Sequence, residues 1–220
     1  MHPKRTVLFA MLLLLVASPG AAQLTPPCGD ECLLGVFDDS TMTRKFGFWD
    51  PTAVPLKELW VGIQFDPAFP NPGVTGVEFG IAGIPAEVSF DVDYPVQPTV
   101  VIGDLRAPAD TISTGFPGGA NIAWPACLEG ERILVKLTLF YTQPLPSDLL
   151  FRVVRKYPPS NPIFLRVGFT QCDAVFTLTS IAGGCYTLNP SGPPPGSFDG
   201  CDAGHPVGSR TWSAIKTLFR

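Results

Sequence analysis

Short runs of alternating apolar and polar residues, separated by turn formers, fill the segment 33–188 and constrain the fold most. In an extended segment 87–93, Val88, Phe90 and Val92 would point one way and the polar residues between them the other way. A period of two is typical of a strand that is buried on one face and exposed to solvent on the other. Pro, Gly, Asn and Asp separate the runs at intervals of about 8 to 15 residues, which favours antiparallel strands.

Four further runs repeat this period. They are Val77, Phe79 and Ile81; Leu59, Val61, Ile63 and Phe65; Ile133, Val135, Leu137, Leu139 and Tyr141; and Ile163, Leu165, Val167 and Phe169. Shorter runs bring the expected number of strands to about 9 to 11, and each apolar face needs a second layer to cover it. No helical period longer than two turns precedes residue 205. We therefore predict a mainly β protein, with a single antiparallel two-sheet sandwich over residues 23–189.

The first 22 residues have the composition of a secretory signal peptide. Lys4 and Arg5 supply the positive charge, an apolar stretch of about 11 residues follows, and small residues precede an expected cleavage after Ala22. The apolar stretch is shorter than the roughly 20 residues of a membrane-spanning helix. We expect an exported protein that does not span a membrane and resides in the periplasm, at the cell surface or outside the cell.

The composition changes again after residue 189. Residues 190–208 are rich in Pro and Gly and predict a linker. In residues 209–220, Trp212, Ile215 and Phe219 recur at helical spacing, which predicts a short amphipathic helix. That helix is expected to dock on its own domain or to engage a partner.

Six cysteines follow the expected cleavage point, an even number that predicts disulfides in an exported protein. The spacing favours Cys127 with Cys172 and Cys185 with Cys201, which leaves Cys28 with Cys32. The second pair would tether the linker. A zinc site is disfavoured because no C-x-x-C motif is present and His205 is the only histidine after residue 22.

The charge of the chain argues against nucleic acid as a partner. The sequence has 15 basic and 19 acidic residues, and cleavage would remove Lys4 and Arg5 and leave a net charge of about −6. Binding to phosphates needs a concentrated basic surface. The basic residues cluster only at 44–45 and 155–156, so we expect no nucleic-acid partner.

No catalytic motif is evident, and no cofactor is expected. A serine hydrolase would need a base, but His205 lies in the linker and no G-x-S-x-G motif occurs. A carboxylate-pair hydrolase needs only two acids, and Asp91 and Asp93 share a strand face. Calcium could be held by loop acids, for which the candidates are Asp38 with Asp39, Asp66, and Asp199 with Asp202. Turn formation explains the same acids without an ion.

Aromatic residues are the remaining candidates for binding. Trp49, Trp60 and Trp124 could stack on sugar rings, with Trp60 on the opposite strand face from Leu59 and Val61. Trp212 in the terminal segment could engage a partner protein instead.

Two parts of the chain carry a resemblance. The run Gly73–Pro85, followed by Gly130–Leu139, resembles the strand pair of cohesin-like and related Ig-like sandwiches. The segments 121–127 and 159–162 and the tail T-W-x-x-[IV]-K-x-L-[FY]-R resemble uncharacterised exported proteins of environmental bacteria. Both resemblances imply a β-sandwich, and neither carries over a functional residue.

The sequence therefore favours an exported, non-catalytic interaction module or a structural module of the cell envelope. Carbohydrate binding through exposed aromatic residues is one alternative, and a carboxylate-pair hydrolase is the other.

Overall fold

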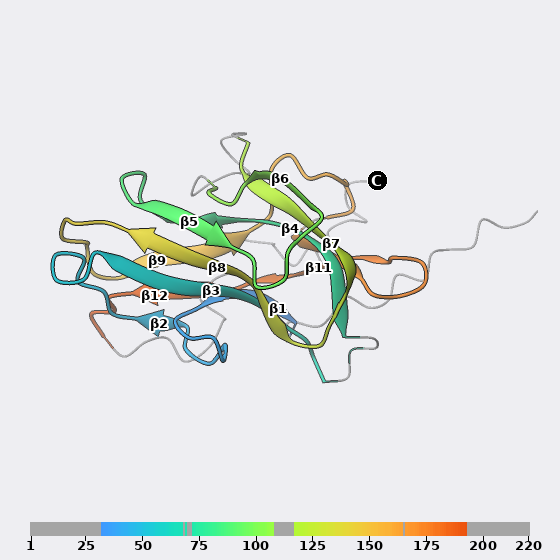
Figure 1. Cartoon of the computed structure of the whole chain (residues 1–220), viewed down its shortest axis with the longest axis horizontal. Helices are drawn as coiled ribbons and strands as arrows, with labels where there is room; N and C mark the ends of the chain where they lie inside the picture. Colours follow the sequence, from blue (N-terminus) through green and yellow to red (C-terminus); the bar gives the residue numbers. More distant parts are fainter. Residues whose placement is uncertain (1–31, 68, 70–71, 108–116, 165, 193–220) are drawn as a thin grey trace, which may run out of the picture.

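The computed structural model describes residues 32–67, 69, 72–107, 117–164 and 166–192. This part of the chain is mainly β and has no helix (Figure 1). It therefore contains no helix that is long and apolar enough to cross a membrane. The expected signal peptide and the expected amphipathic helix at 209–220 lie outside the described residues.

Twelve strands are present in this part of the chain, slightly more than the alternation predicts. They are β1 (Leu33–Phe37), β2 (Phe46–Gly47), β3 (Leu56–Gln64), β4 (Gly73–Ala82), β5 (Ser89–Asp93), β6 (Val100–Asp104), β7 (Gly119–Glu129), β8 (Arg132–Phe140), β9 (Leu149–Val154), β10 (Val167–Gln171), β11 (Leu178–Gly183) and β12 (Cys185–Leu188).

All twelve strands belong to one hydrogen-bonded sheet. The main path is β2-β12-β9-β4-β10-β11-β1-β3-β8-β5, and β7 branches from β4 and carries β6 on its other side. Most pairs are antiparallel, as predicted, but β1 pairs with β11 and β2 with β12 in parallel. The parallel pair of β1 and β11 joins the strands β2-β12-β9-β4-β10-β11 to the strands β1-β3-β8-β5, so the sheet is continuous.

Two long segments make this continuity possible. The first part of β4 pairs with β7 and β10, whereas its last residues, Gly80 to Ala82, pair with β9. The segment that forms β11 and β12 pairs first with β10 and β1 and then with β9. Gly184 lies between them and bonds to Leu34 of β1 and Val153 of β9. Each segment thus leaves one set of strands and joins another.

The predicted strand faces form one hydrophobic core. Leu59, Val61 and Ile63 of β3 are fully buried in it with Phe79 and Ile81 of β4. Phe65, after β3, lies with its ring centroid 6.0 Å from that of Phe169 of β10. The alternation therefore predicted the buried faces of β3 and β4 correctly.

Two details of the predicted faces are wrong. The register shifts by one residue between Val61 and Gly62, opposite Leu134, so that Leu134 joins the core and Ile133 packs on the other side of the sheet. The expected strand from Ile163 begins only at Val167, because Asn161 closes a turn by accepting a bond from the amide of Ile163.

Candidate binding surfaces

Trp49 supports the fold rather than presenting its ring to a ligand. Its side chain is only 5% exposed, and the indole N–H donates to the carbonyl oxygen of Val54 at 2.6 Å. The side-chain amide of Asn189 bonds to both the backbone N–H and the carbonyl of Trp49. This tryptophan therefore joins two loops, and its ring is not available for stacking on a sugar.

Trp124 is buried to the same extent and belongs to the main core. Its indole N–H donates to the carbonyl oxygen of Val96 at 2.9 Å, which satisfies the one polar atom of the ring. Burial of Trp49 and Trp124 argues against two of the four tryptophans proposed for binding. Trp212 lies outside the described residues.

Trp60 is the predicted binding residue that remains partly exposed. Leu59 and Val61 on either side of it are fully buried, so its side chain lies on the opposite face of β3, as predicted. Its cross-strand neighbours are Phe37 of β1 and Lys136 of β8. Lys136 in turn pairs with Glu58 at 2.5 Å, which places both charges beside the indole.

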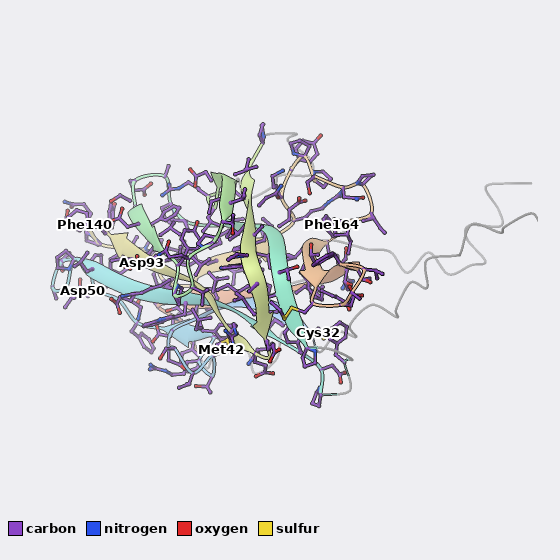
Figure 2. All side chains as sticks on the ribbon, turned by 45° about the vertical axis from the view of Figure 1, so that its right-hand side comes forward. Cys32, Met42, Asp50, Asp93, Phe140 and Phe164 are labelled. Atoms are coloured by element: carbon purple, nitrogen blue, oxygen red, sulfur yellow. A yellow bond between two sulfur atoms is a disulfide. The ribbon has the colours of Figure 1, made fainter. Side chains whose placement is uncertain are left out.

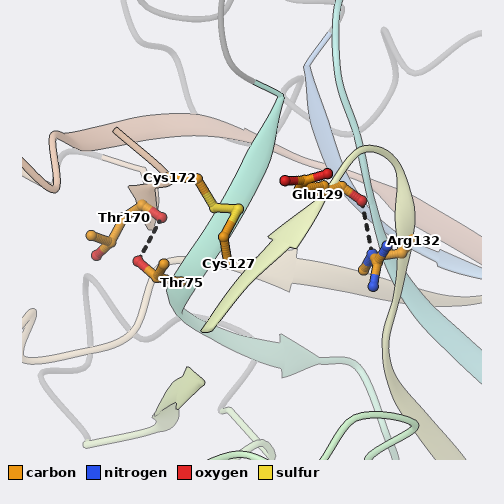
Figure 3. Close-up of a disulfide and its surroundings, with 6 residues drawn as sticks. All are labelled: Thr75, Cys127, Glu129, Arg132, Thr170 and Cys172. Atoms are coloured by element: carbon orange, nitrogen blue, oxygen red, sulfur yellow. Dashed lines mark hydrogen bonds between the residues drawn. A yellow bond between two sulfur atoms is a disulfide. The ribbon is translucent and has the colours of Figure 1, made fainter. Parts of the chain in front are cut away.

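One predicted disulfide is confirmed: Cys127 of β7 is bonded to Cys172, which follows β10 (Figure 3). Both strands flank β4, and Gly73 of β4 lies beneath the bridge, since a Cβ there would come within 2.9 Å of both sulfur atoms. Cys32 and Cys185 are also disulfide-bonded. Cys28 and Cys201, their predicted partners, lie outside the described residues, so these pairings remain predictions.

Of the loop acids considered for calcium, Asp38, Asp39 and Asp66 already have protein partners, whereas Asp199 and Asp202 lie outside the described residues. Asp39 accepts bonds from the backbone N–H groups of Thr41, Thr43 and Arg44 and from their side chains. Burial alone would raise the pKa of Asp39, but these donors outweigh it and hold the pKa well below its usual value. Within the described ranges no group of three or more His, Cys, Asp or Glu side chains could hold a metal ion.

Asp38, next to it, belongs to a charged cluster that shares Arg44 with Asp39. Its carboxylate accepts a bond from the hydroxyl of Tyr186 at 2.7 Å and pairs with Lys57 and Arg44. Burial, and then the contact with Asp38, raise the pKa of Tyr186 far above its usual value. A Cβ at Gly47 would collide with both Asp38 and Tyr186. The cluster fastens the loop after β1 to β12 and β3.

The acids proposed for a hydrolase do not meet in a cleft. Asp91 and Asp93 are exposed on β5 and lie opposite Thr138 and Lys136. A hollow of about 750 Å³ has Asp104 as the one acid in its lining, and a hollow of about 450 Å³ has Asp50 as the one acid in its lining. A carboxylate-pair hydrolase needs two acids in one cleft, on opposite sides of the bound glycoside.

The strand β6 is a more unusual surface. All five of its residues are exposed, and it pairs with β7 on one edge only, with no strand on the other edge among those described. Val100, Val101 and Ile102 are 42%, 43% and 60% exposed. Three consecutive exposed β-branched residues on an open edge form a template for another strand.

A hollow of about 750 Å³ adjoins the end of β6. Gly103 and Asp104 of β6 belong to its lining, and Tyr157, Pro158 and Ile84 contribute apolar surface. Arg106, also in the lining, donates to the carbonyls of Pro85 and Val88 and lies over the ring of Phe90. The wall formed by Arg106 is therefore held in place by its own contacts.

The comparisons with known proteins do not extend this description. A scan against models of protein families finds no match for the chain, and a search of curated proteins finds none either. The class that the structure defines is that of a mainly β protein with a disulfide across its sheet.

Proposed function

We propose that this protein is an exported, non-catalytic interaction module that binds an extended segment of a partner by adding it as a strand to β6. The observation that carries the proposal is the open edge of β6, with its exposed Val100, Val101 and Ile102. The disulfide is compatible with export, because such bonds persist in oxidising compartments.

We also propose that the sheet is folded into two layers, as in a sandwich. Support comes from the core, in which strands of the path β1-β3-β8 meet strands of the path β10-β4-β7. The rings of Phe65 and Phe69, after β3, lie 6.0 and 6.1 Å from that of Phe169 on β10. In such an arrangement β5 and β6 are both edges, so they can be compared directly.

The two edges differ in how they are protected. In β5 the exposed positions hold Ser89, Asp91 and Asp93, and charge on an edge strand discourages pairing with another chain. In β6 the only charge is Asp104, at the end of the strand. An unprotected apolar edge in a sheet whose edge β5 carries charges supports a binding role for β6.

The adjoining hollow would provide specificity. In strand addition the backbone supplies affinity, and pockets beside the edge select alternate side chains of the added strand. Because Tyr157, Pro158 and Ile84 line the hollow, we expect it to select an apolar side chain at the end of the bound segment.

A selection of random displayed peptides against the purified protein tests this proposal. We expect the selected peptides to alternate apolar and polar residues and to bind at least tenfold more weakly to the double variant Val100→Lys/Ile102→Lys. Both positions are exposed, so the fold should tolerate the change. Asp91→Lys on β5 is the matched control and should leave binding unchanged. Equal binding to the double variant, or a selection that yields no peptide, would refute the proposal.

A second candidate function, carbohydrate binding, is favoured by Trp60 alone. Its partly exposed indole lies beside the ion pair of Glu58 and Lys136, and such groups can hydrogen-bond sugar hydroxyls while the ring stacks. A glycan array probed with the protein and with Trp60→Ala tests this function. A signal that Trp60→Ala abolishes would support it, and a blank array would exclude the glycans tested.

A further inference from the structure

A second apolar surface lies at one end of the molecule. We call the exposed side chains Phe48, Val54, Leu56 and Phe140 the end patch; they are 68%, 57%, 52% and 48% exposed. Leu56 and Phe140 are cross-strand partners in β3 and β8. Figure 2 shows Phe140 and Asp50 at this same end, away from Phe164 and Cys32.

Hydrogen bonds hold the loops of this end together. The amide of Tyr141 donates to the carbonyl of Pro55, and Trp49 bonds to Val54. The loops line a shallow, open hollow of about 450 Å³, which we call the end hollow. Its lining consists of Phe48, Trp49, Asp50, Pro51, Pro144, Leu145, Ser147, Asn189 and Pro190. The surface is thus a fixed apolar depression with exposed aromatic side chains at its margin.

The described chain leaves the domain at this depression. Asn189 and Pro190 belong to the end hollow, and Ser191 is fastened there because its amide donates to the carboxylate of Asp148 at 2.8 Å. Nineteen residues, 193–211, separate the last described residue from Trp212. The predicted bridge between Cys185 and Cys201 would hold Cys201 at β12, which leaves residues 202–211 to span the distance to Trp212. A flexible chain of those ten residues has an end-to-end distance of about 17 Å, and about 33 Å when fully extended. The end hollow includes Asn189, four residues after Cys185, so this span suffices for a return to the end patch.

The segment 209–220 has the chemistry to fill this surface. Trp212, Ile215 and Phe219 lie on one side if the segment is helical, as its spacing predicts. It contains three basic residues, Arg210, Lys216 and Arg220, and no acid, although the whole chain is acidic.

The end of the domain provides matching negative charge. Asp50 lines the end hollow, and Asp148 lies beside it. Bonds from Thr52 lower the pKa of Asp50, and bonds from Ser191 lower that of Asp148, so both carboxylates are ionised at neutral pH.

We propose that residues 209–220 of this same chain dock as an amphipathic helix on the end patch, with their apolar side chains over the end hollow. Docking covers the exposed rings of Phe48 and Phe140 and places Lys216 and its basic neighbours against Asp50 and Asp148. This inference does not depend on strand addition at β6, since neither the end patch nor the end hollow contains a residue of β6.

Photo-crosslinking in the full-length chain tests the docking. p-Benzoylphenylalanine is placed at position 140, and at position 176 as the matched control, since Phe176 is 62% exposed on the turn between β10 and β11. We expect position 140, and not position 176, to crosslink to residues 209–220. Mixing of isotopically light and heavy protein distinguishes crosslinks within a chain from crosslinks between chains.

Three crosslinking outcomes would overturn the proposal. They are a crosslink between chains, which would assign the surface to a second copy; a crosslink from position 140 to another segment; and no crosslink at all. Lys216→Glu should lower the yield at least threefold, and Lys156→Glu, which changes the charge equally at a distant loop, should not.

Thermal unfolding provides an independent measurement. Deletion of residues 209–220 should lower the Tm of the parent protein, but it should have no further effect in the Phe140→Ser variant. A deletion that leaves the parent Tm unchanged, or that acts equally in both backgrounds, would also refute the docking.

Discussion

The disulfide between Cys127 and Cys172 should be a main source of stability, because it closes a loop of 45 residues across the strand β4. In the chain-entropy model, a loop of that length restricts the unfolded chain by about 4 kcal/mol at 25 °C. For a protein of this size, 1 kcal/mol corresponds to about 2 to 4 °C in Tm. We therefore expect Cys127→Ala/Cys172→Ala to lower the Tm by about 8 to 16 °C.

Substitution is preferable to reduction in this experiment, because a reductant would also attack the disulfides of Cys32 and Cys185. Urea unfolding followed by tryptophan fluorescence gives the free energy difference directly. A loss below about 1 kcal/mol would contradict the loop argument.

Gly73 makes the test specific to the position of the bridge. A Cβ at this residue would lie 2.9 Å from both sulfur atoms and 3.2 Å from the Cβ of Cys172. Gly73→Ala should therefore cost about 1 to 3 kcal/mol in the parent protein, as overpacking does. In the background without sulfur atoms only the milder Cβ contact remains, and the cost should fall below about 1 kcal/mol. Equal costs in the two backgrounds would show that the bridge does not pass over β4.

Three further predictions concern side chains that hydrogen-bond within the fold. Both carboxylate oxygens of the buried Glu78 accept the amide of Ser160, so Glu78→Ala should lower the free energy of unfolding by about 1 to 3 kcal/mol and Glu78→Gln by less, as measured in urea. Tyr186→Phe removes the hydroxyl that Asp38 accepts and should cost about 1.5 to 3 kcal/mol, whereas Tyr157→Phe, at the rim of the larger hollow, should cost less than 0.5 kcal/mol in the same assay. The pKa of Asp39 is lowered in the folded protein, so its carboxylate stabilises the fold at a pH above the unfolded value near 3.8, and this stabilisation is lost as the pH falls below that value. Urea titrations at pH 7 and pH 3 should therefore show a smaller decrease in the free energy of unfolding for Asp39→Asn than for the parent protein.

The alternation of side chains predicted most of the strands because burial on one face acts at every second residue. Leu59, Val61 and Ile63 could be assigned to the core from the sequence alone. Ile133 could not be assigned correctly, since a one-residue bulge opposite Gly62 reverses the faces and leaves no mark in a pattern of consecutive apolar residues. The pairing of Cys127 with Cys172 was predictable from the spacing, but the passage of the bridge over Gly73 was not.

The candidate sites were harder to predict, because exposure depends on which segments cover a residue. Tryptophan is a residue type expected at sugar-binding sites. Trp49 and Trp124 are nevertheless buried, and each donates its indole N–H to a backbone carbonyl. Trp124 shares the buried face of β7 with Ile122, and Trp60 points outward from β3, so the alternation of each strand gives its direction. Trp49 lies outside a strand, where no alternation applies. Periodicity gives the face of a residue, whereas the burial of a loop aromatic depends on distant segments such as the one that holds Asn189.

The same reasoning explains why the open edge at β6 could not be found in the sequence. Val100, Val101 and Ile102 are a short apolar run, which is also the pattern of a central strand buried on both faces. The pairing of β6 with β7 alone reverses that interpretation, because the same side chains then lie at an edge without a second neighbour. Charges on β5 show that this sheet carries edge protection elsewhere, so the apolar edge of β6 is a local exception. If that exception had no binding role, Val100→Lys/Ile102→Lys would improve solubility and leave every interaction of the protein intact, which is the result that would most directly oppose the proposed function.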